Sequence, residues 1–253
     1  MKCKICNSDT TPIFKAKIIN KYDVQYYECP RCLFIQTEKE YWLKEAYQSS
    51  MNISDTGVLT RNILLGLKTS LIIQFLFNRK GKFLDYAGGW GIFTRLMRDI
   101  GFDFYWFDPY TSNELARGFE ADLSERYEAL TIFEGFEHFQ NPYEDLEKMF
   151  KLSDTIIFST TLVPKPTPQP KDWWYYGLEH GQHVALYSKE SFEFIAKKYN
   201  CNYYTDGKYM HMFTRRKISK LLFFFLTSFF GFLLIPLVLV TNKSKTITDS
   251  KSF

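Results

Sequence analysis

The first 214 residues lack an excess of basic charge, because 25 Lys and Arg stand against 27 Asp and Glu. A body with a net charge of −2 does not have the electrostatic footprint of a general nucleic-acid binder, so we expect no nucleic-acid partner. The first ten residues are polar, and we therefore expect no amino-terminal signal peptide.

The chain also lacks the G-x-G-x-x-G pattern of a dinucleotide-binding turn. Hydrophobic residues nevertheless make up 45% of its 253 positions, and aromatic residues make up 19%. This composition supplies a large core for one substantial domain with small appendages. We expect most of the aromatic rings to serve core packing and membrane contact.

Four of the five cysteines form two C-x2-C pairs, Cys3 with Cys6 and Cys29 with Cys32. Four thiolates in two such turns can surround one tetrahedral zinc ion, and a segment of about 35 residues needs a staple of this kind. Two structural disulfides are the alternative. A zinc site with four protein ligands has no open position, so its role is structural. We expect Cys201 to be a small buried residue.

A glycine-rich turn follows a short apolar strand that begins at Phe83. The helix predicted after the turn has apolar residues at helical spacing up to Ile100, and Gly101 ends it. A second predicted strand, 104–107, leads to Asp108. That position, at the carboxyl end of a strand, suits a carboxylate that binds ribose hydroxyls.

The turn reads Asp85-x-Ala87-Gly88-Gly89-x-Gly91 and resembles motif I of class I S-adenosylmethionine-dependent methyltransferases. The resemblance implies an α/β, Rossmann-like sheet with helices on both faces. Ala87 stands where the motif has glycine, and a methyl group fits there if φ is negative. The implied cofactor-binding residues are Asp85, Ala87, Gly88, Gly89, Gly91, Asp108, Pro109, Glu134 and His138.

Further strands and helices alternate after Asp108, as in a parallel sheet. The segment 131–138 is similar to the fourth strand of the family and its acidic exit, so Glu134, Glu137 and His138 are expected near the methionine part of the cofactor. A helix at 143–150 and a strand at 155–159 follow. Because the cofactor implies a reducing cytosol, zinc is favoured over disulfides at the four cysteines.

A proline-rich stretch, 160–172, is expected to be extended and to border the acceptor site. It precedes a segment rich in rings that contains Glu179, His180 and His183. A histidine that titrates near neutrality is a natural general base, so we expect His183 to be catalytic with Glu179 or His180 assisting. A hydrogen-bonded loop or a metal site are the alternatives.

Together these motifs are similar to a branch of bacterial methyltransferases associated with sugars and surface polysaccharides, whose C-methylating members carry Glu-His-x-x-Tyr. Here Gln182 precedes His183, and Tyr187 follows one place late. The resemblance therefore implies methyl transfer to an oxygen or a carbon of a sugar. Alternative functions are an RNA or small-molecule methyltransferase, or a non-catalytic cofactor-binding scaffold for membrane glycan assembly.

Residues 221–242 contain no charged side chain. A helix of this length is long enough to cross a bilayer core of about 30 Å. Basic residues at 215–220 favour a cytoplasmic flank. We expect a tail anchor or a re-entrant helix, with the catalytic domain on the inner face of the cell membrane. A pair of amphipathic helices packed on the domain is the alternative.

The sequence thus predicts a zinc ribbon, a helical lid or linker, a methyltransferase domain and a hydrophobic tail, with no indication of the oligomeric state. Helices before the first strand commonly cover the cofactor in this family, which makes Tyr47, Asp55 and Arg61 further candidates. The four segments are residues 1–40, 41–80, 81–215 and 216–253, respectively.

Overall fold

A computed structural model describes residues 1–48 and 55–252. Its larger sheet has six strands, and the alternation predicted from the sequence is confirmed there. In spatial order the strands are β5 (Asp103–Phe107), β4 (Lys82–Tyr86), β6 (Ala129–Phe133), β7 (Thr155–Ser159), β10 (Met210–Thr214) and β9 (Asn202–Thr205).

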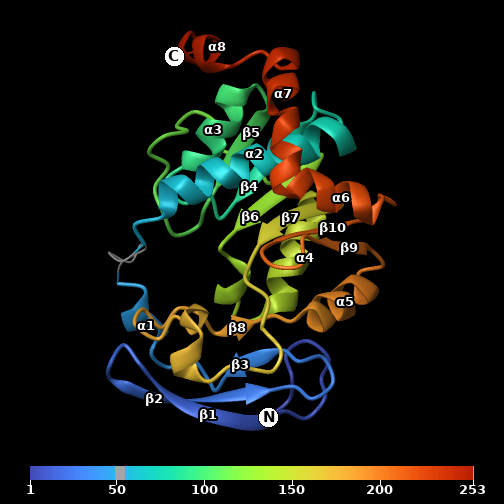
Figure 1. The fold of residues 1–253 in the computed structure, drawn as a ribbon. Coiled ribbons are helices and arrows are strands. Elements are labelled where there is room, and N and C mark those ends of the chain that lie inside the picture. Colours follow the sequence, from blue (N-terminus) through green and yellow to red (C-terminus); the bar gives the residue numbers. More distant parts are fainter. Residues whose placement is uncertain (49–54, 253) are drawn as a thin grey trace.

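The first four strands of this sheet run parallel, and β10 runs antiparallel to both of its neighbours. Side chains alternate between the two faces of each strand, so neighbouring residues enter different cores. Phe83 packs with α2 and α3, whereas Leu84 packs on the opposite face with α4 and α5. The helices are α2 (Val58–Leu76), α3 (Ile92–Ile100), α4 (Pro142–Leu152) and α5 (Lys189–Lys198), and they cover both faces of the sheet (Figure 1).

The helix ends follow local chemistry. Gly101 ends α3 with a φ of 118°, a left-handed conformation that glycine adopts without strain. Ser188 caps α5 by accepting a hydrogen bond from the backbone N–H of Ser191. The predicted end of α3 at Gly101 is confirmed. The short helices before the hydrophobic tail are α1 (Leu43–Ala46), η1 (Phe136–His138), η2 (Pro170–Asp172) and η3 (Trp174–Tyr176).

A second sheet joins the amino-terminal cysteine segment to a strand from much later in the chain. Its order is β1 (Thr11–Ile18), β2 (Tyr22–Glu28), β3 (Ile35–Thr37) and β8 (Ala185–Leu186). The antiparallel pairing of Gln36 with Ala185 places β8, which follows His183 by one residue, on the cysteine segment. Ser188 also donates its hydroxyl to the carbonyl of Cys32, at 2.6 Å.

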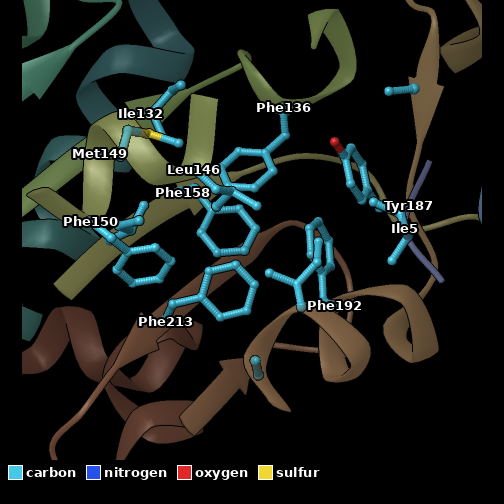
Figure 2. Close-up of a cluster of buried hydrophobic side chains, with 14 of the residues drawn as sticks. Ile5, Ile132, Phe136, Leu146, Met149, Phe150, Phe158, Tyr187, Phe192 and Phe213 are labelled. Atoms are coloured by element: carbon cyan, nitrogen blue, oxygen red, sulfur yellow. The ribbon is translucent and has the colours of Figure 1, made fainter. Parts of the chain in front are cut away.

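One hydrophobic core extends from the large sheet to the cysteine segment. Figure 2 shows the rings of Phe136, Phe158 and Phe192 grouped together, with Tyr187 beside them and Ile5 at one end. Phe136 and Phe158 stack with their ring centroids 4.2 Å apart. Because Ile5 lies between Cys3 and Cys6 and is buried in this core, the cysteine segment and the large sheet are packed as one body.

The hydrophobic tail is divided where the sequence suggested one helix. It forms α6 (Lys220–Thr227), the 3-10 helix η4 (Phe229–Leu234) and α7 (Ile235–Thr241), followed by α8 (Thr246–Ser250). Extended backbone at Ser228 ends α6, and Pro236, which has no N–H, lies in the first turn of α7. No single described helix is long and apolar enough to cross a membrane. The helix pair Lys220–Thr227 and Phe229–Thr241, which is bent by 77°, is long and apolar enough when the two are taken together.

Candidate functional site

The turn between β4 and α3 has left-handed backbone at three positions. The φ angles are 58° at Ala87, 53° at Gly89 and 82° at Gly91. The condition under which a methyl group fits easily at this position, a negative φ, is therefore not met at Ala87. A left-handed alanine costs roughly 1–2 kcal/mol, so the turn holds this residue in a strained conformation.

Gly88 and Gly89 face opposite sides of the turn. A Cβ on Gly88 would lie 2.7 Å from Asp85 Oδ2 and from a ring carbon of Trp106, so the turn is packed tightly from behind. A Cβ on Gly89 would meet nothing within 4 Å. The backbone at Gly89 therefore borders open space, as a turn that approaches a ligand requires.

Asp85 supports the turn from inside the domain. Its carboxylate is buried and accepts hydrogen bonds from the hydroxyls of Thr94 on α3, at 2.9 Å, and Thr131 on β6, at 3.2 Å. Burial raises the pKa of Asp85 to about 7. Asp85 therefore joins β4, α3 and β6 behind the turn.

Asp108 ties the turn to the end of β5. One carboxylate oxygen accepts the N–H of Gly89 at 2.9 Å, and the other accepts the N–H groups of Tyr110 and Thr111. Pro109 is exposed beside it. Each carboxylate oxygen has about two acceptor sites, so the oxygen bonded to Gly89 keeps one for a hydroxyl. The open face of Gly89 beside this acid fits S-adenosylmethionine.

Glu134 lies at the exit of β6, in a left-handed conformation with a φ of 51°. Its carboxylate accepts the hydroxyl of Ser159, at 2.7 Å, and its charge helps to raise the pKa of Arg61. Arg61 also makes a two-pronged ion pair with Asp55, with distances of 2.7 and 3.0 Å. Two of the candidate residues before the first strand are thus close to the sheet edge that carries Glu134.

His183 lies next to the residues that follow β6. Its Nδ1–H donates to the carbonyl of Tyr175 at 2.7 Å, which leaves Nε2 with a free lone pair. The His183 ring centroid lies 5.1 Å from that of His138 and 4.7 Å from that of His180. Burial and the two neighbouring histidines lower the pKa of His183 well below its usual value, so the ring is neutral at pH 7.

Glu137 is the carboxylate that the structure brings to His183, and Glu179 is not. Glu137 is fully buried, and neither of its oxygens has a well-formed hydrogen bond among the described residues, although Tyr175 is close enough to favour its charged form. Burial raises its pKa to about 8. Glu179 is exposed on the surface, and its charge acts on His180.

Sequence reasoning placed His138 and Glu137 on the cofactor side of the pocket and missed their contact with His183. Ligand atoms of Glu137, His138 and His183 lie within 4.8 Å of one another, a set that suits either an acceptor hydroxyl or a metal ion. Tyr47 completes the group through a 2.9 Å hydrogen bond between its hydroxyl and His138 Nδ1. The sequence indicated only that Glu137 and His138 follow β6. It gave no sign that His183, 45 positions after His138, lies beside them.

The four amino-terminal cysteines form the second cluster. Cys3 Sγ lies 3.5 Å from Cys32 Sγ, Cys6 Sγ lies 3.3 Å from Cys29 Sγ, and all four atoms lie within 4.8 Å of one another. None of them forms a disulfide. Both turns repeat the same geometry, because the residue after each pair is left-handed, with φ of 58° at Asn7 and 53° at Leu33. Four converging thiols fit one tetrahedral zinc ion.

The sequence comparison agrees with this arrangement of turn, acid and sheet edge. A family model described as "Methyltransferase domain" matches residues 65–205, which is more than half of the chain. The chain belongs to this methyltransferase family. It is an S-adenosylmethionine-dependent methyltransferase, with the Rossmann-like sheet expected from the glycine turn.

Solved methyltransferases resemble the chain at low sequence identity. The plantazolicin methyltransferase BpumL, solved in complex with SAH, has a TM-score of 0.46 and 14% identity over 64% of this chain and 86% of its own. The magnesium protoporphyrin IX methyltransferase of Synechocystis PCC 6803, solved with bound SAH, has a TM-score of 0.43 and 13% identity over 68% and 90%. No curated protein matches the sequence. These similarities carry no information about the acceptor.

Replacing Ala87 by glycine tests the strain in the turn. We expect Ala87→Gly to raise the free energy of unfolding by about 0.5–1 kcal/mol, since glycine adopts a positive φ without a Cβ clash. Urea denaturation measures this change, and Ala121→Gly, at a position without a positive φ, should destabilise instead. A destabilised Ala87→Gly variant would show that the turn is not strained at this residue.

The raised pKa of Asp85 predicts a pH dependence of stability. The folded state holds this proton up to about pH 7, whereas an unfolded aspartate releases it near pH 3.9. The contribution of Asp85 to the free energy of unfolding is therefore complete below pH 4 and is lost as the pH rises to about 7. In denaturation series from pH 4 to 7, Asp85→Asn should lose stability less steeply than the wild-type protein, and equal slopes would contradict the raised pKa.

Proposed function

We propose that the protein transfers a methyl group from S-adenosylmethionine to an oxygen or carbon of a sugar-containing acceptor, in surface-polysaccharide biosynthesis. The observation that carries this proposal is the neutral His183, whose ring is fixed by Tyr175 and lies beside Glu137 and His138. A hydroxyl-rich acceptor needs such a density of polar groups. A neutral imidazole is also ready to accept its proton.

The cofactor residues and the histidine cluster share one edge of the sheet. Gly89 follows β4, Asp108 follows β5 and His138 follows β6, and these three strands run parallel. Their carboxyl ends therefore meet at the same edge, where α/β proteins bind ligands. When bound there, S-adenosylmethionine supplies an electrophilic methyl group on a sulfonium, and Asp108 and Gly89 would hold it.

His183 takes the proton of the acceptor in the proposed reaction. The proton would pass from the acceptor oxygen or carbon to Nε2, while the acceptor would form its new bond to the methyl carbon, the bond between that carbon and sulfur would break, and S-adenosylhomocysteine would leave. The carbonyl of Tyr175 keeps the donor nitrogen in place, and the buried Glu137 carboxyl, with a ligand atom within 4.8 Å of one on His183, would stabilise the positive charge that develops on the ring. Glu137 thus takes the assisting role that the sequence suggested for Glu179 or His180.

Most of the aromatic side chains before His183 pack in the core and are not available to an acceptor. Trp173, Tyr175 and Tyr176 are buried against the amino-terminal sheet, whereas Trp174 is 76% exposed. We therefore assign only Trp174 as a ring available to the apolar face of a sugar. The buried rings instead hold the backbone carbonyl that orients His183.

We further propose that the four cysteines bind one structural zinc ion. The repeated left-handed turns and the converging thiols support this assignment. Since β3 of the same segment pairs with β8, the metal would act on catalysis through the position of His183. We also propose that the catalytic domain works at the inner face of the cell membrane, held there by its hydrophobic tail.

A panel of nucleotide sugars incubated with labelled S-adenosylmethionine tests the acceptor class. We expect label transfer to at least one member, with a product that mass spectrometry assigns to a sugar oxygen or carbon. Transfer only to RNA, with binding that weakens steeply as salt rises, would replace the sugar proposal by RNA modification. Binding of S-adenosylmethionine with no transfer to any acceptor would support a scaffold.

Substituting His183 tests the proton acceptor. We expect His183→Ala to lower kcat by about 10²–10⁴, the range of general-base catalysis, with the Kd for S-adenosylmethionine within about twofold of wild type. His183→Asn keeps an amide donor for the Tyr175 carbonyl and should be equally slow. His180→Ala is the matched neighbour and should retain most activity. An active His183→Asn variant would remove His183 as the base.

Substituting Cys32 tests the proposed zinc and its connection to the site. Wild-type protein should contain one zinc ion per chain by elemental analysis, and Cys32→Ser should contain much less. The variant should also lose turnover more than S-adenosylmethionine affinity, because β3 positions β8 and not the glycine turn. Cys201→Ser, outside the cluster, is the control. Full zinc content in Cys32→Ser would exclude the four-thiol site.

A further inference from the structure

The hydrophobic tail, residues 220–241, presents an unusual number of large apolar side chains to solvent. Leu221 is 83% exposed, Phe229 81%, Leu233 77% and Val240 86%. Phe224, Phe225, Phe230, Leu237 and Leu239 are exposed as well. Soluble proteins rarely leave so many neighbouring large side chains uncovered, so this surface is suited to an apolar partner.

The opposite side of the tail is part of the protein core. Phe223, Leu226 and Val238 are fully buried and pack with Leu65 and Ile72 of α2. Both α6 and α7 contact α2, and in Figure 1 α7 and α8 lie at the end of the molecule away from β1 and β2. The tail is thus a packed element with one uncovered face.

Both ends of the tail are fixed to the same domain. Before it, Arg216 donates to the carbonyl of Leu76 and pairs with Glu128 at 2.8 Å. After it, the Asp249 carboxylate receives two hydrogen bonds from Arg98, at 2.7 and 2.9 Å. Arg98 is almost completely buried, and burial of a charged pair requires this close geometry.

These two attachments decide how the tail can meet a bilayer. A segment that crosses a membrane once leaves on the far side, whereas this segment returns to Arg98 on the domain from which it started. Asn242 also donates to Gln74 on α2, at 2.9 Å, directly after the tail. A single crossing would break the buried Arg98–Asp249 pair and uncover the α2 side of the core.

The charges beside the tail are of one sign. No Asp or Glu occurs between Gly207 and Thr248. Among the residues that the structure describes, Lys217, Lys220 and Lys243 form no ion pair. Free ammonium groups at both ends of an uncovered apolar face complement a surface of anionic lipid headgroups.

We propose that the uncovered face of residues 220–241 lies in the plane of an anionic bilayer, so that the protein is attached to one leaflet without crossing it. The apolar side chains enter the boundary between headgroups and acyl chains, and Lys217, Lys220 and Lys243 stay at headgroup level. This mode differs from the tail anchor or re-entrant helix expected from the sequence. It rests on the membrane attachment named above and is independent of the acceptor.

Flotation with vesicles tests the attachment without any methyl-transfer measurement. Full-length protein should float with vesicles of phosphatidylcholine containing about 30% phosphatidylglycerol and less with phosphatidylcholine alone. Leu221→Ser with Phe229→Ser and Leu233→Ser should weaken binding more than tenfold, since three exposed apolar side chains are lost. Leu115→Ser with Leu123→Ser, two exposed leucines elsewhere, is the matched control and should bind normally.

Lysine substitutions measure the electrostatic contribution to vesicle binding. Lys217→Gln, Lys220→Gln and Lys243→Gln together should weaken binding to the anionic vesicles by tenfold or more and remove most of its salt dependence. An absence of vesicle binding, with a dimer that the serine variants dissociate in light scattering, would assign the face to a second copy of the chain and overturn the proposal.

Labelling of the carboxyl terminus distinguishes attachment from crossing. Ser252 is exposed just beyond α8, so Ser252→Cys in vesicle-bound protein should react with a membrane-impermeant thiol reagent equally with and without detergent. Peptide mass analysis separates this label from the native cysteines. Labelling that requires detergent would show that the tail crosses the bilayer and would overturn the proposal, with the methyltransferase assignment unaffected.

Discussion

The backbone pairing of β3 with β8 connects the cysteine segment to the strand that follows His183. Without this pairing, His183 would lie on a long irregular connection after the proline-rich loop. The pairing, the Ser188 hydrogen bond to Cys32 and the buried rings around Tyr175 fix its backbone from several sides. The position of the proposed base thus depends on residues at the opposite end of the chain.

The cofactor side of the site is built differently, from a strained turn held at its back. Asp85 anchors it to α3 and β6, Asp108 anchors it to β5, and Gly88 leaves no space behind it. These contacts offset the cost of the left-handed Ala87. These contacts therefore hold the turn in one conformation, in which the side of the backbone at Gly89 stays uncovered.

The hydrophobic tail is also held in place by contacts with distant parts of the chain, at the outer surface of the domain. One side of it completes the core over α2, so the tail contributes to folding as well as to the proposed attachment. The chain on either side of the tail is held to the domain by two ion pairs, Arg216 with Glu128 and Asp249 with Arg98. Attachment to a bilayer would then orient the whole body, because no flexible linker separates the uncovered face from the sheet.

The sequence alone determined the parts whose signals are local. Hydrophobic periodicity and glycine positions predicted β4, β5 and α3 with its end at Gly101, and the two C-x2-C pairs predicted the cysteine cluster, because each depends on neighbours a few residues apart. Only the tertiary structure decided that Glu137 meets His183, that Ala87 is left-handed and that the tail returns to Arg98. These features depend on burial and on contacts between distant segments, which no short pattern encodes.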